Sequence, residues 1–450
     1  MQIPRPNRLL SVAVVGGGIS GVVAALKLAQ SGSFSVTILE KENQIGGLSS
    51  SYEWQDLTCD RFYHVILPTD SHLLQFIDAL GLKSALYWRE TKTGFYGQGR
   101  LVSFSSMGDF FRFPFMSIYE KLRLGLGIFY ANQLRAPEKL DSISARSWLT
   151  RIFGVRTYEN IWEPLLRSKF GEARDKVSAS LICATIKRLY GTRSAINKQE
   201  RLGYVHGRYK AVFEAARRRI EEAGGKILTC ANVEKVALDR QNGKIVVVAN
   251  SRSLEFDKLV LTIPCQETLR IFEDNKEHPY WRRLGQIEYL GVICLLLVLK
   301  RRLSPYYVIN LLDRTLPFTG IVESTNVISP ASLRNRHLVY LPKYVTKDEP
   351  LLNMSDQEIW SLFFEKLCEV FPELRREDIL HKKVFREKYV QPVLNVGFLE
   401  KLIGFRTPWP GVYLVNSSMI SDSTLNNNAM VNLASRAAEM IIEDNVLAGS

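Results

Sequence analysis

A glycine-rich turn near the start of the chain constrains the fold more than any other feature. Gly16, Gly18 and Gly21 have the spacing G-x-G-x-x-G and follow directly after the apolar run Val12–Val15. Such a run is typical of a buried parallel strand, and the residues after the turn place apolar side chains at helical spacing. In this arrangement the second glycine lets the backbone approach a pyrophosphate, and the third lets the helix pack against the strand. The sequence therefore predicts a strand–turn–helix unit that binds a dinucleotide.

The residues after this turn complete the pattern. The expected helix begins at Ile19 and Ser20, and its N-terminal N–H groups and dipole suit a phosphate. Val36–Glu40 predicts a second strand that ends in a carboxylate, which can accept hydrogen bonds from ribose hydroxyls. A second glycine pair, Gly46-Gly47, follows a few residues later. The candidate cofactor-binding residues of this region are Gly16, Gly18, Ile19, Ser20, Gly21, Glu40, Lys41, Gly47, Leu48 and Ser49.

The whole pattern, from Gly16 through Glu40 to Gly47-Leu48-Ser49, resembles flavoproteins of the amine oxidase, protoporphyrinogen oxidase and phytoene desaturase superfamily. In that group the second glycine pair approaches the pyrophosphate and leads the chain toward the flavin ring. The resemblance therefore implies FAD as the cofactor. No cysteine lies in a recognisable flavin-attachment context, so we expect the FAD to be bound noncovalently. The chain has no second strand–glycine–helix pattern, which disfavours a separate domain for NAD(P)H.

The resemblance also implies an α/β fold of the amine oxidase type, with a discontinuous Rossmann-type FAD-binding domain and an α+β substrate domain. We expect residues 1–90, 205–270 and 400–450 to form the FAD-binding domain. Residues 91–204 are expected to form a helical domain facing substrate or membrane, and residues 271–399 a mixed-sheet substrate domain. The later elements expected in the FAD-binding domain are a helix at Phe213–Ala223, strands at Lys226–Cys230, Val233–Leu238, Ile245–Val248, Leu254–Pro264 and Val412–Val415, and a helix at Ala429–Ile442.

Two residues of these later segments are cofactor candidates by the same resemblance. Val233 would contact the adenine through its backbone. Relatives usually have Gly-Asp after the last strand, with the acid near the phosphates or the ribityl chain, whereas this chain has Asn416-Ser417. Amide and hydroxyl groups can hydrogen-bond a phosphate or a ribityl chain without repelling it. We therefore keep Asn416 as a cofactor-binding candidate.

Candidate catalytic residues are polar groups that could face the ring, because a flavin itself supplies hydride or electron transfer. His64 lies where relatives bring the chain past the isoalloxazine. It is either an acid/base group or a hydrogen-bond donor to substrate, or else a hydrogen-bonded structural histidine. Gln391 precedes the return to the FAD-binding domain, with an ordinary loop residue as the alternative. Glu323 lies on an expected strand of the substrate sheet, with a surface position as the alternative. Lys343 is the residue we single out as a counterpart of the water-bridged lysine of many amine oxidases.

Charge and composition limit the partners. The formal net charge is +13, and without a nucleic-acid-binding module this charge favours an anionic membrane surface or an acidic substrate. Phe110–Leu134 mixes aromatic, apolar and basic residues, so it is either a core helix pair or an interfacial membrane segment. In protoporphyrinogen oxidases the helical domain faces the membrane. No run of about 20 apolar residues predicts a transmembrane helix, and the dispersed cysteines and histidines predict neither a metal site nor a disulfide framework.

These observations lead to three hypotheses. The first is an FAD-dependent oxidoreductase that acts on a small-molecule, largely apolar or lipid-like substrate and passes electrons to oxygen, a quinone or a protein. The second is a flavin-dependent isomerase similar to UDP-galactopyranose mutase, although the nucleotide-sugar arginine and tyrosine motif of those enzymes is not matched. The third is a non-catalytic protein with a structural flavin. Because reduced thiols are expected, we predict a cytoplasmic protein that associates peripherally with a membrane if the interfacial interpretation holds.

Overall fold

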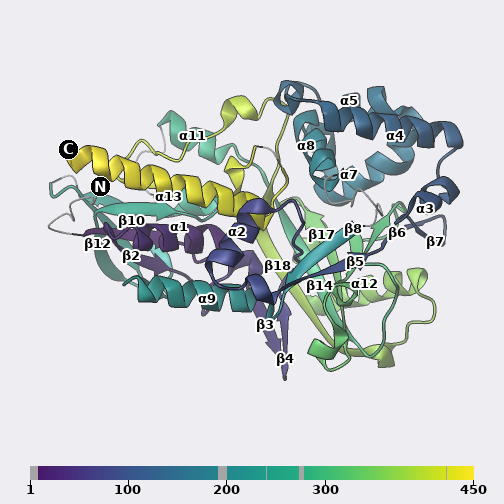
Figure 1. Cartoon of the computed structure of the whole chain (residues 1–450), viewed down its shortest axis with the longest axis horizontal. Coiled ribbons are helices and arrows are strands. Elements are labelled where there is room, and N and C mark those ends of the chain that lie inside the picture. Colours follow the sequence, from purple (N-terminus) through teal and green to yellow (C-terminus); the bar gives the residue numbers. More distant parts are fainter. Residues whose placement is uncertain (1–8, 191–199, 240, 273–277, 422, 450) are drawn as a thin grey trace.

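The computed structural model describes residues 9–190, 200–239, 241–272, 278–421 and 423–449. It confirms the α/β fold class. Figure 1 shows a parallel sheet with its helices at one end of the molecule, and a helical region and a second large sheet at the other end. The boundaries between the three expected domains remain predictions.

The parallel sheet has five strands in the order β19-β13-β1-β2-β9. Its strands are β1 (Leu10–Val15), β2 (Phe34–Leu39), β9 (Lys226–Leu228), β13 (Lys258–Leu261) and β19 (Val412–Leu414). In the central strand, Val12, Ala13 and Val14 are fully buried, as expected for a strand covered on both faces. β1 and β2 pair from Leu10↔Phe34 to Val15↔Leu39. Their carboxyl ends therefore meet at one edge of the sheet, and the glycine turn begins there.

Three helices pack together against this sheet: α1 (Ile19–Gln30), α9 (Arg208–Glu222) and α13 (Asn427–Gly449). α1 contacts both α9 and α13, and most of its side chains are buried. The sequence predicted α9 and α13 correctly, although each begins earlier than expected. Because α13 closes one side of α1, the end of the chain completes a unit that the start of the chain begins.

One predicted strand is wrong. Leu254–Pro264 is not continuous but divides into β12 (Arg252–Phe256) and β13, which belong to different sheets. Asp257 stands at the break, where its carboxylate accepts hydrogen bonds from Ser11 N and Oγ, each at 2.8 Å. This carboxylate also pairs with Lys244 at 2.5 Å. β12 joins a three-stranded antiparallel sheet with β10 (Val233–Asp239) and β11 (Lys244–Ala249).

The second large sheet is mixed and has seven strands in the order β18-β14-β17-β16-β15-β6-β7. Its strands are β6 (Thr93–Gly97), β7 (Arg100–Ser103), β14 (Tyr289–Leu299), β15 (Val308–Leu311), β16 (Gly320–Glu323), β17 (His337–Val345) and β18 (Ile379–Pro392). β14 is buried along nearly its whole length. Helix α12 (Asp356–Val370) packs on this sheet, with Ile359, Phe363 and Leu367 fully buried.

The helical region has its own hydrophobic core. Its principal helices are α3 (Met107–Arg112), α4 (Ile118–Gln133), α5 (Ala145–Phe153), α7 (Glu163–Phe170) and α8 (Ala179–Tyr190). Trp148, Phe153 and Phe170 are buried at its centre. α4 begins at a capping box, in which Ser117 accepts from Glu120 N and the Glu120 carboxylate accepts from Ser117 N. Phe110–Leu134 thus contains the end of α3 and the whole of α4.

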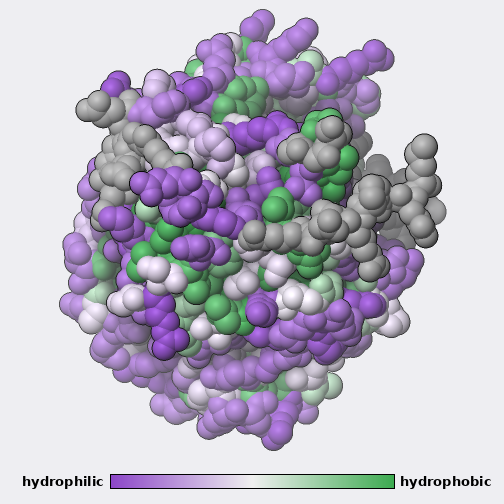
Figure 2. All heavy atoms as spheres, turned by 90° about the vertical axis from the view of Figure 1, so that its left-hand side faces the viewer, coloured by the Kyte–Doolittle hydropathy of each residue, from purple (hydrophilic) through white to green (hydrophobic). Residues whose placement is uncertain are grey.

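The surface differs between the two ends of the molecule. Figure 2 shows the left-hand end of Figure 1, where hydrophilic side chains predominate and hydrophobic residues appear in small groups between them. At the other end, α3 and α4 expose large apolar side chains. Within the described residues, no helix is both long enough and apolar enough to span a membrane.

Candidate functional site

Two glycine loops meet at the carboxyl edge of the parallel sheet. Gly46 N donates to Gly17 O at 2.8 Å, and Gly18 and Gly46 form a bridge. A Cβ on Gly47 would lie 3.1 Å from Gly18 Cα, and Gly47 has a positive φ of 55°. Side chains other than hydrogen are therefore disfavoured at Gly47. This close approach explains why the sequence carries a second glycine pair.

The first loop has one glycine for packing and one beside open space. A Cβ on Gly21 would lie 1.9 Å from Gly16 O, so only glycine allows α1 to start this close to β1. A Cβ on Gly18 would meet nothing nearer than Gly47 Cα at 3.9 Å. Gly47 is exposed and Gly18 is half-buried. The two glycines thus present bare backbone to the same side.

The N-terminus of α1 is suited to bind an anion. Its N-cap is Gly18, no side chain caps it, and its first turn has no acidic residue. Ile19 and Ser20, both buried, begin this turn. Uncapped N–H groups and the positive end of the helix dipole favour a phosphate. The geometry therefore fits the pyrophosphate of a dinucleotide.

Glu40 organises the same edge of the sheet. It is buried, and its carboxylate accepts from Gly17 N at 2.6 Å and from Glu42 N at 2.9 Å. The second lone pair of each oxygen remains to accept from ribose hydroxyls. Lys41, by contrast, is exposed and lies 3.9 Å from Glu42.

The segment before β10 runs beside Glu40. Ala231 N donates to Glu40 O, and Cys230 N donates to Glu42 O, both at 2.8 Å. Val233, two residues further on, is buried at the start of β10. This placement agrees with a position beside the nucleotide, and the contact with adenine remains a prediction.

His64 belongs to a hydrogen-bonded group that joins three segments. Its Nδ1 donates to Phe62 O at 2.9 Å, which leaves Nε2 as the acceptor, 3.1 Å from Ser49 Oγ. Asn427 Nδ2, at the start of α13, donates to Ser49 Oγ at 3.1 Å. Leu48, beside this group, is half-buried. Burial lowers the pKa of His64 to about 4, so the imidazole is neutral at physiological pH and acts as an acceptor rather than a general acid.

Two other candidates from the sequence, Gln391 and Asn416, form hydrogen bonds with the backbone of neighbouring segments. Gln391 is buried, and its Oε1 accepts from Leu425 N at 2.9 Å, which ties it to the segment that leads into α13. Asn416 is buried as well: its amide donates to Ile263 O, and its Oδ1 accepts from Ser418 N. Both side chains hold backbone in place, and contacts to a cofactor or substrate remain predictions.

Glu323 is not at the surface, so the surface alternative for it is wrong. It is 1% exposed, and its carboxylate accepts from Leu303 N at 3.0 Å and Ser304 N at 2.8 Å. Burial raises the pKa of its carboxyl to about 7. Ser304 Oγ also donates to this carboxylate, at 3.2 Å. These partners lie between β14 and β15, and this favours an anchoring role over catalysis. Lys343 lies on β17 and pairs with Ile293 of β14 in the ladder.

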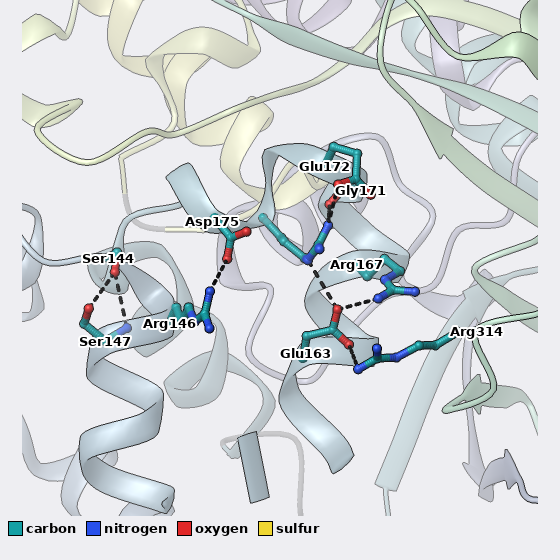
Figure 3. Close-up of polar contacts among 10 residues, drawn as sticks. Ser144, Arg146, Ser147, Glu163, Arg167, Gly171, Glu172, Asp175 and Arg314 are labelled. Atoms are coloured by element: carbon teal, nitrogen blue, oxygen red, sulfur yellow. Dashed lines mark hydrogen bonds and ion pairs between the residues drawn. The ribbon is translucent and has the colours of Figure 1, made fainter. Parts of the chain in front are cut away.

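Sequence reasoning missed the polar contacts of α7. Glu163, at the start of this helix, is buried and receives three guanidinium groups: Arg167 at 2.7 Å, Arg174 at 3.3 Å and Arg314 at 2.9 Å. Figure 3 shows Arg167 and Arg314 pointing toward the Glu163 carboxylate from two sides. Arg314 follows β15, so the cluster fastens the helical region to the seven-stranded sheet. The i,i+4 spacing of Glu163 and Arg167 was visible in the sequence, but the two distant arginines were not.

Comparison with known proteins agrees with this geometry. The family model for flavin-containing amine oxidoreductases matches residues 19–424. The tomato (Solanum lycopersicum) 15-cis-phytoene desaturase is 22% identical over 429 residues, covering 87% of this chain and 70% of that protein. A candidate protoporphyrinogen oxidase from Exiguobacterium sp. 255-15 has a similar structure, with a TM-score of 0.76, 18% identity, and coverage of 97% and 99% of the two chains. Reduced UDP-galactopyranose mutase gives a TM-score of 0.71 at 14% identity, with coverage of 97% and 94%.

The chain belongs to the flavin-containing amine oxidoreductase family. A flavin cofactor follows from that membership, and the residues present fit one. The bare backbone of Gly18 and Gly47, the uncapped start of α1 and the free lone pairs of Glu40 are suited to the nucleotide part. Ser50 Oγ, beside the second glycine pair, is buried without a hydrogen-bond partner among the described residues.

Glu40 gives a first test of this site. We expect Glu40→Gln to weaken flavin binding by about tenfold or more, because a hydrogen bond to a charged acceptor contributes about 1.5–3 kcal/mol. Turnover per bound flavin should stay nearly unchanged. Glu42→Gln is the matched control, since the Glu42 side chain is exposed and its ion-pair partner among the described residues is Lys41 at 3.9 Å. Flavin affinity of the apoprotein, measured by fluorescence quenching, checks this; equal affinities for the two variants would contradict the role given to Glu40.

Proposed function

We propose that this protein is an oxidoreductase with noncovalently bound FAD that dehydrogenates or saturates a largely apolar or lipid-like substrate, as protoporphyrinogen oxidases and phytoene desaturases do with theirs. The observation that carries the proposal is that the second glycine loop leads to Ser49, whose hydroxyl lies 3.1 Å from His64 Nε2. The nucleotide-binding residues and His64 therefore belong to one site. When bound, the flavin supplies hydride or electron transfer. The protein residues bind and orient the cofactor, and burial keeps the His64 imidazole neutral.

An apolar substrate agrees with the side chains around Tyr63, the residue that precedes His64 in the sequence. Tyr63 belongs to a largely buried group with Tyr340 and Tyr344, and the Tyr63 and Tyr340 rings are 6.2 Å apart. Burial raises the pKa of all three phenols, so they stay neutral. Neutral hydroxyl groups among aromatic rings suit a mostly hydrocarbon substrate that carries few polar groups.

The purified protein tests the proposal directly. It should be yellow, acid should release FAD, and one or more of porphyrinogens, polyenes, amines or lipid-linked sugars should reduce the flavin anaerobically. Interconversion of a nucleotide sugar by the reduced protein, without net oxidation, would instead establish the isomerase alternative. Retention of flavin with no reduction or isomerisation by any of these compounds would favour the structural-flavin alternative.

The exposed apolar side chains of α3 and α4 support peripheral membrane association. We define the α3–α4 ridge as Met107, Phe111, Ile118, Tyr119, Leu122, Leu126, Phe129 and Tyr130, all of them exposed. Leu126 is 71% and Tyr119 68% exposed. Contiguous exposed apolar side chains of this size mark an interaction surface. The exposed Arg112 and Arg135 flank the ridge and suit anionic headgroups.

Burial distinguishes the aromatic residues that could enter a membrane from those that could not. Phe113 is 2% exposed and packs against the rings of Phe95, Phe104 and Phe115, so it cannot insert. Phe111 is 52% exposed and belongs to the ridge. Alternation of aromatic residues in the sequence did not distinguish the inner from the outer positions, because α3 is short and the chain turns after it.

Leu126 gives the sharpest test of membrane association. We expect Leu126→Glu to reduce sedimentation with phosphatidylglycerol vesicles by about tenfold or more, because burial of one leucine side chain contributes about 1.5–3 kcal/mol. Leu447→Glu on α13 is the matched control, since Leu447 is 74% exposed and belongs to the other end of the molecule. High salt should weaken binding of the parent protein without abolishing it. Equal binding by both variants would exclude the ridge as the membrane-binding surface.

A further inference from the structure

Lys169 reaches from the helical region to the segment that leads into α13. It lies one turn after Leu165 on α7, and its Nζ donates to Thr424 Oγ1 at 3.1 Å. Thr424 is buried. On the same helix, Glu163 and Arg167 belong to the arginine cluster that fastens α7 to the sheet. The cluster therefore fixes the helix that carries Lys169.

The segment around Thr424 also forms one wall of the candidate site. Leu425 N donates to Gln391, and Asn427 donates to Ser49, which contacts His64. Lys169 and His64 are thus linked through residues only three positions apart in one short segment. The lysine therefore lies at the border of the candidate site. It belongs to α7, a helix for which the sequence predicted no part in catalysis.

The charge of Lys169 has no carboxylate partner within 4 Å among the described residues; Asp422 lies outside them. Burial and, to a lesser extent, the charge of Arg188 on α8 together lower the pKa of Lys169 to about 8. Arg188 itself pairs with the buried Asp70 at 2.9 Å. At neutral pH the ammonium is mostly protonated, yet among the described residues only the neutral hydroxyl of Thr424 accepts from it. An ammonium has three N–H donors, so the described part of the chain supplies too few acceptors and no negative charge for it.

We propose that Lys169 binds the carboxylate or phosphate group of an otherwise apolar substrate. An anion would supply the missing charge and the missing acceptors together. Thr424 can assist, because its oxygen accepts from Lys169 and its hydrogen remains free to donate to the same anion. The inference rests on the proposed function, since it gives the substrate of that site one anionic end and a hydrocarbon body.

The test uses three probes of equal chain length with the flavin-loaded protein: octanoate, octyl phosphate and octanol. Binding is measured by calorimetry and by perturbation of the flavin absorbance. We expect one or both anions to bind about tenfold tighter than octanol, and Lys169→Met to remove this advantage while leaving octanol binding unchanged. Lys169→Arg should retain most of it. The tighter of the two anions identifies carboxylate or phosphate as the natural group.

The pH dependence supplies an independent check. Because the pKa of Lys169 is lowered to about 8, the ammonium is present below this pH and is lost as the pH rises through it. Anion affinity of the parent protein should therefore be highest below pH 8 and fall above it. In Lys169→Arg the affinity should stay level over the same range, since a guanidinium remains protonated.

Lys187→Met is the matched control, because Lys187 is another half-buried lysine of the helical region and donates to Leu134 O at 2.6 Å. It should bind all three probes as the parent does. Anion binding that is unchanged in Lys169→Met, or equal affinity for octanoate, octyl phosphate and octanol, would overturn the inference. These binding measurements need no turnover, so they are separate from failure of the proposed function, which would appear as a flavin-loaded protein that none of the candidate substrates reduces.

Discussion

Replacing Gly18 by valine should give a folded protein that no longer holds its flavin. The backbone of Gly18 has φ −70° and ψ −178°, which valine adopts without strain. A Cβ there would meet no protein atom closer than 3.9 Å. The new side chain would instead occupy the space that the pyrophosphate needs beside the start of α1. We expect flavin binding to weaken by about 100-fold or more, equivalent to about 3 kcal/mol.

Two measurements make this result specific. Circular dichroism and thermal unfolding should show that Gly18→Val folds as the parent does. Gly404→Val is the matched control, because Gly404 is exposed and a Cβ there would also meet nothing within 4 Å. That control should keep its flavin. A fully flavin-loaded Gly18→Val protein would show that the dinucleotide lies elsewhere.

The second large effect is expected at Glu163. Glu163→Gln removes the single negative charge to which Arg167, Arg174 and Arg314 all point. Breaking a buried ion pair by removing one partner destabilises a protein by about 3–5 kcal/mol. We expect about 3 kcal/mol here, near the lower end, because Arg314 is 55% exposed and can turn toward water. Urea denaturation followed by circular dichroism measures the change in the free energy of unfolding.

Glu172→Gln is the matched control for this cluster. Glu172 also pairs with Arg174, at 3.0 Å, but its side chain is 84% exposed. Exposed pairs contribute about 0–1 kcal/mol, so this variant should unfold nearly as the parent does. If both variants lost the same small amount of stability, the Glu163 cluster would be an ordinary surface network and would not fasten the helical region to the sheet.

The sequence predicted those parts of the fold that depend on local spacing. The turn at Gly16–Gly21 and the strands on either side of α1 follow from glycine positions and short apolar runs. The helix at Phe213–Ala223 follows from apolar periodicity, as does the last helix. The break at Asp257 was missed because its cause is a hydrogen bond from Ser11, far away in the chain. A continuous apolar pattern does not reveal that two halves of a run join different sheets.

The candidate site was predictable only where its residues follow the glycine loops. Ser49 and His64 are close in the sequence to Gly47, so their place could be inferred. No local sequence pattern marks Lys169, because its hydrogen-bond partner is Thr424, more than two hundred residues later in the chain. The sequence left Phe110–Leu134 open between a core helix pair and an interfacial segment, because which positions of α4 face outward depends on the neighbouring helices.

The arrangement of β1 among its neighbours has a consequence for how the protein is made. β1 and α1 leave the ribosome early, whereas β13, β19 and α13, which cover them, are translated much later. One edge of β1 and one side of α1 therefore stay uncovered during most of translation. Such surfaces bind other chains readily, so we expect molecular chaperones to hold the nascent protein. Cofactor uptake then has to wait until β13, β19 and α13 have all been translated.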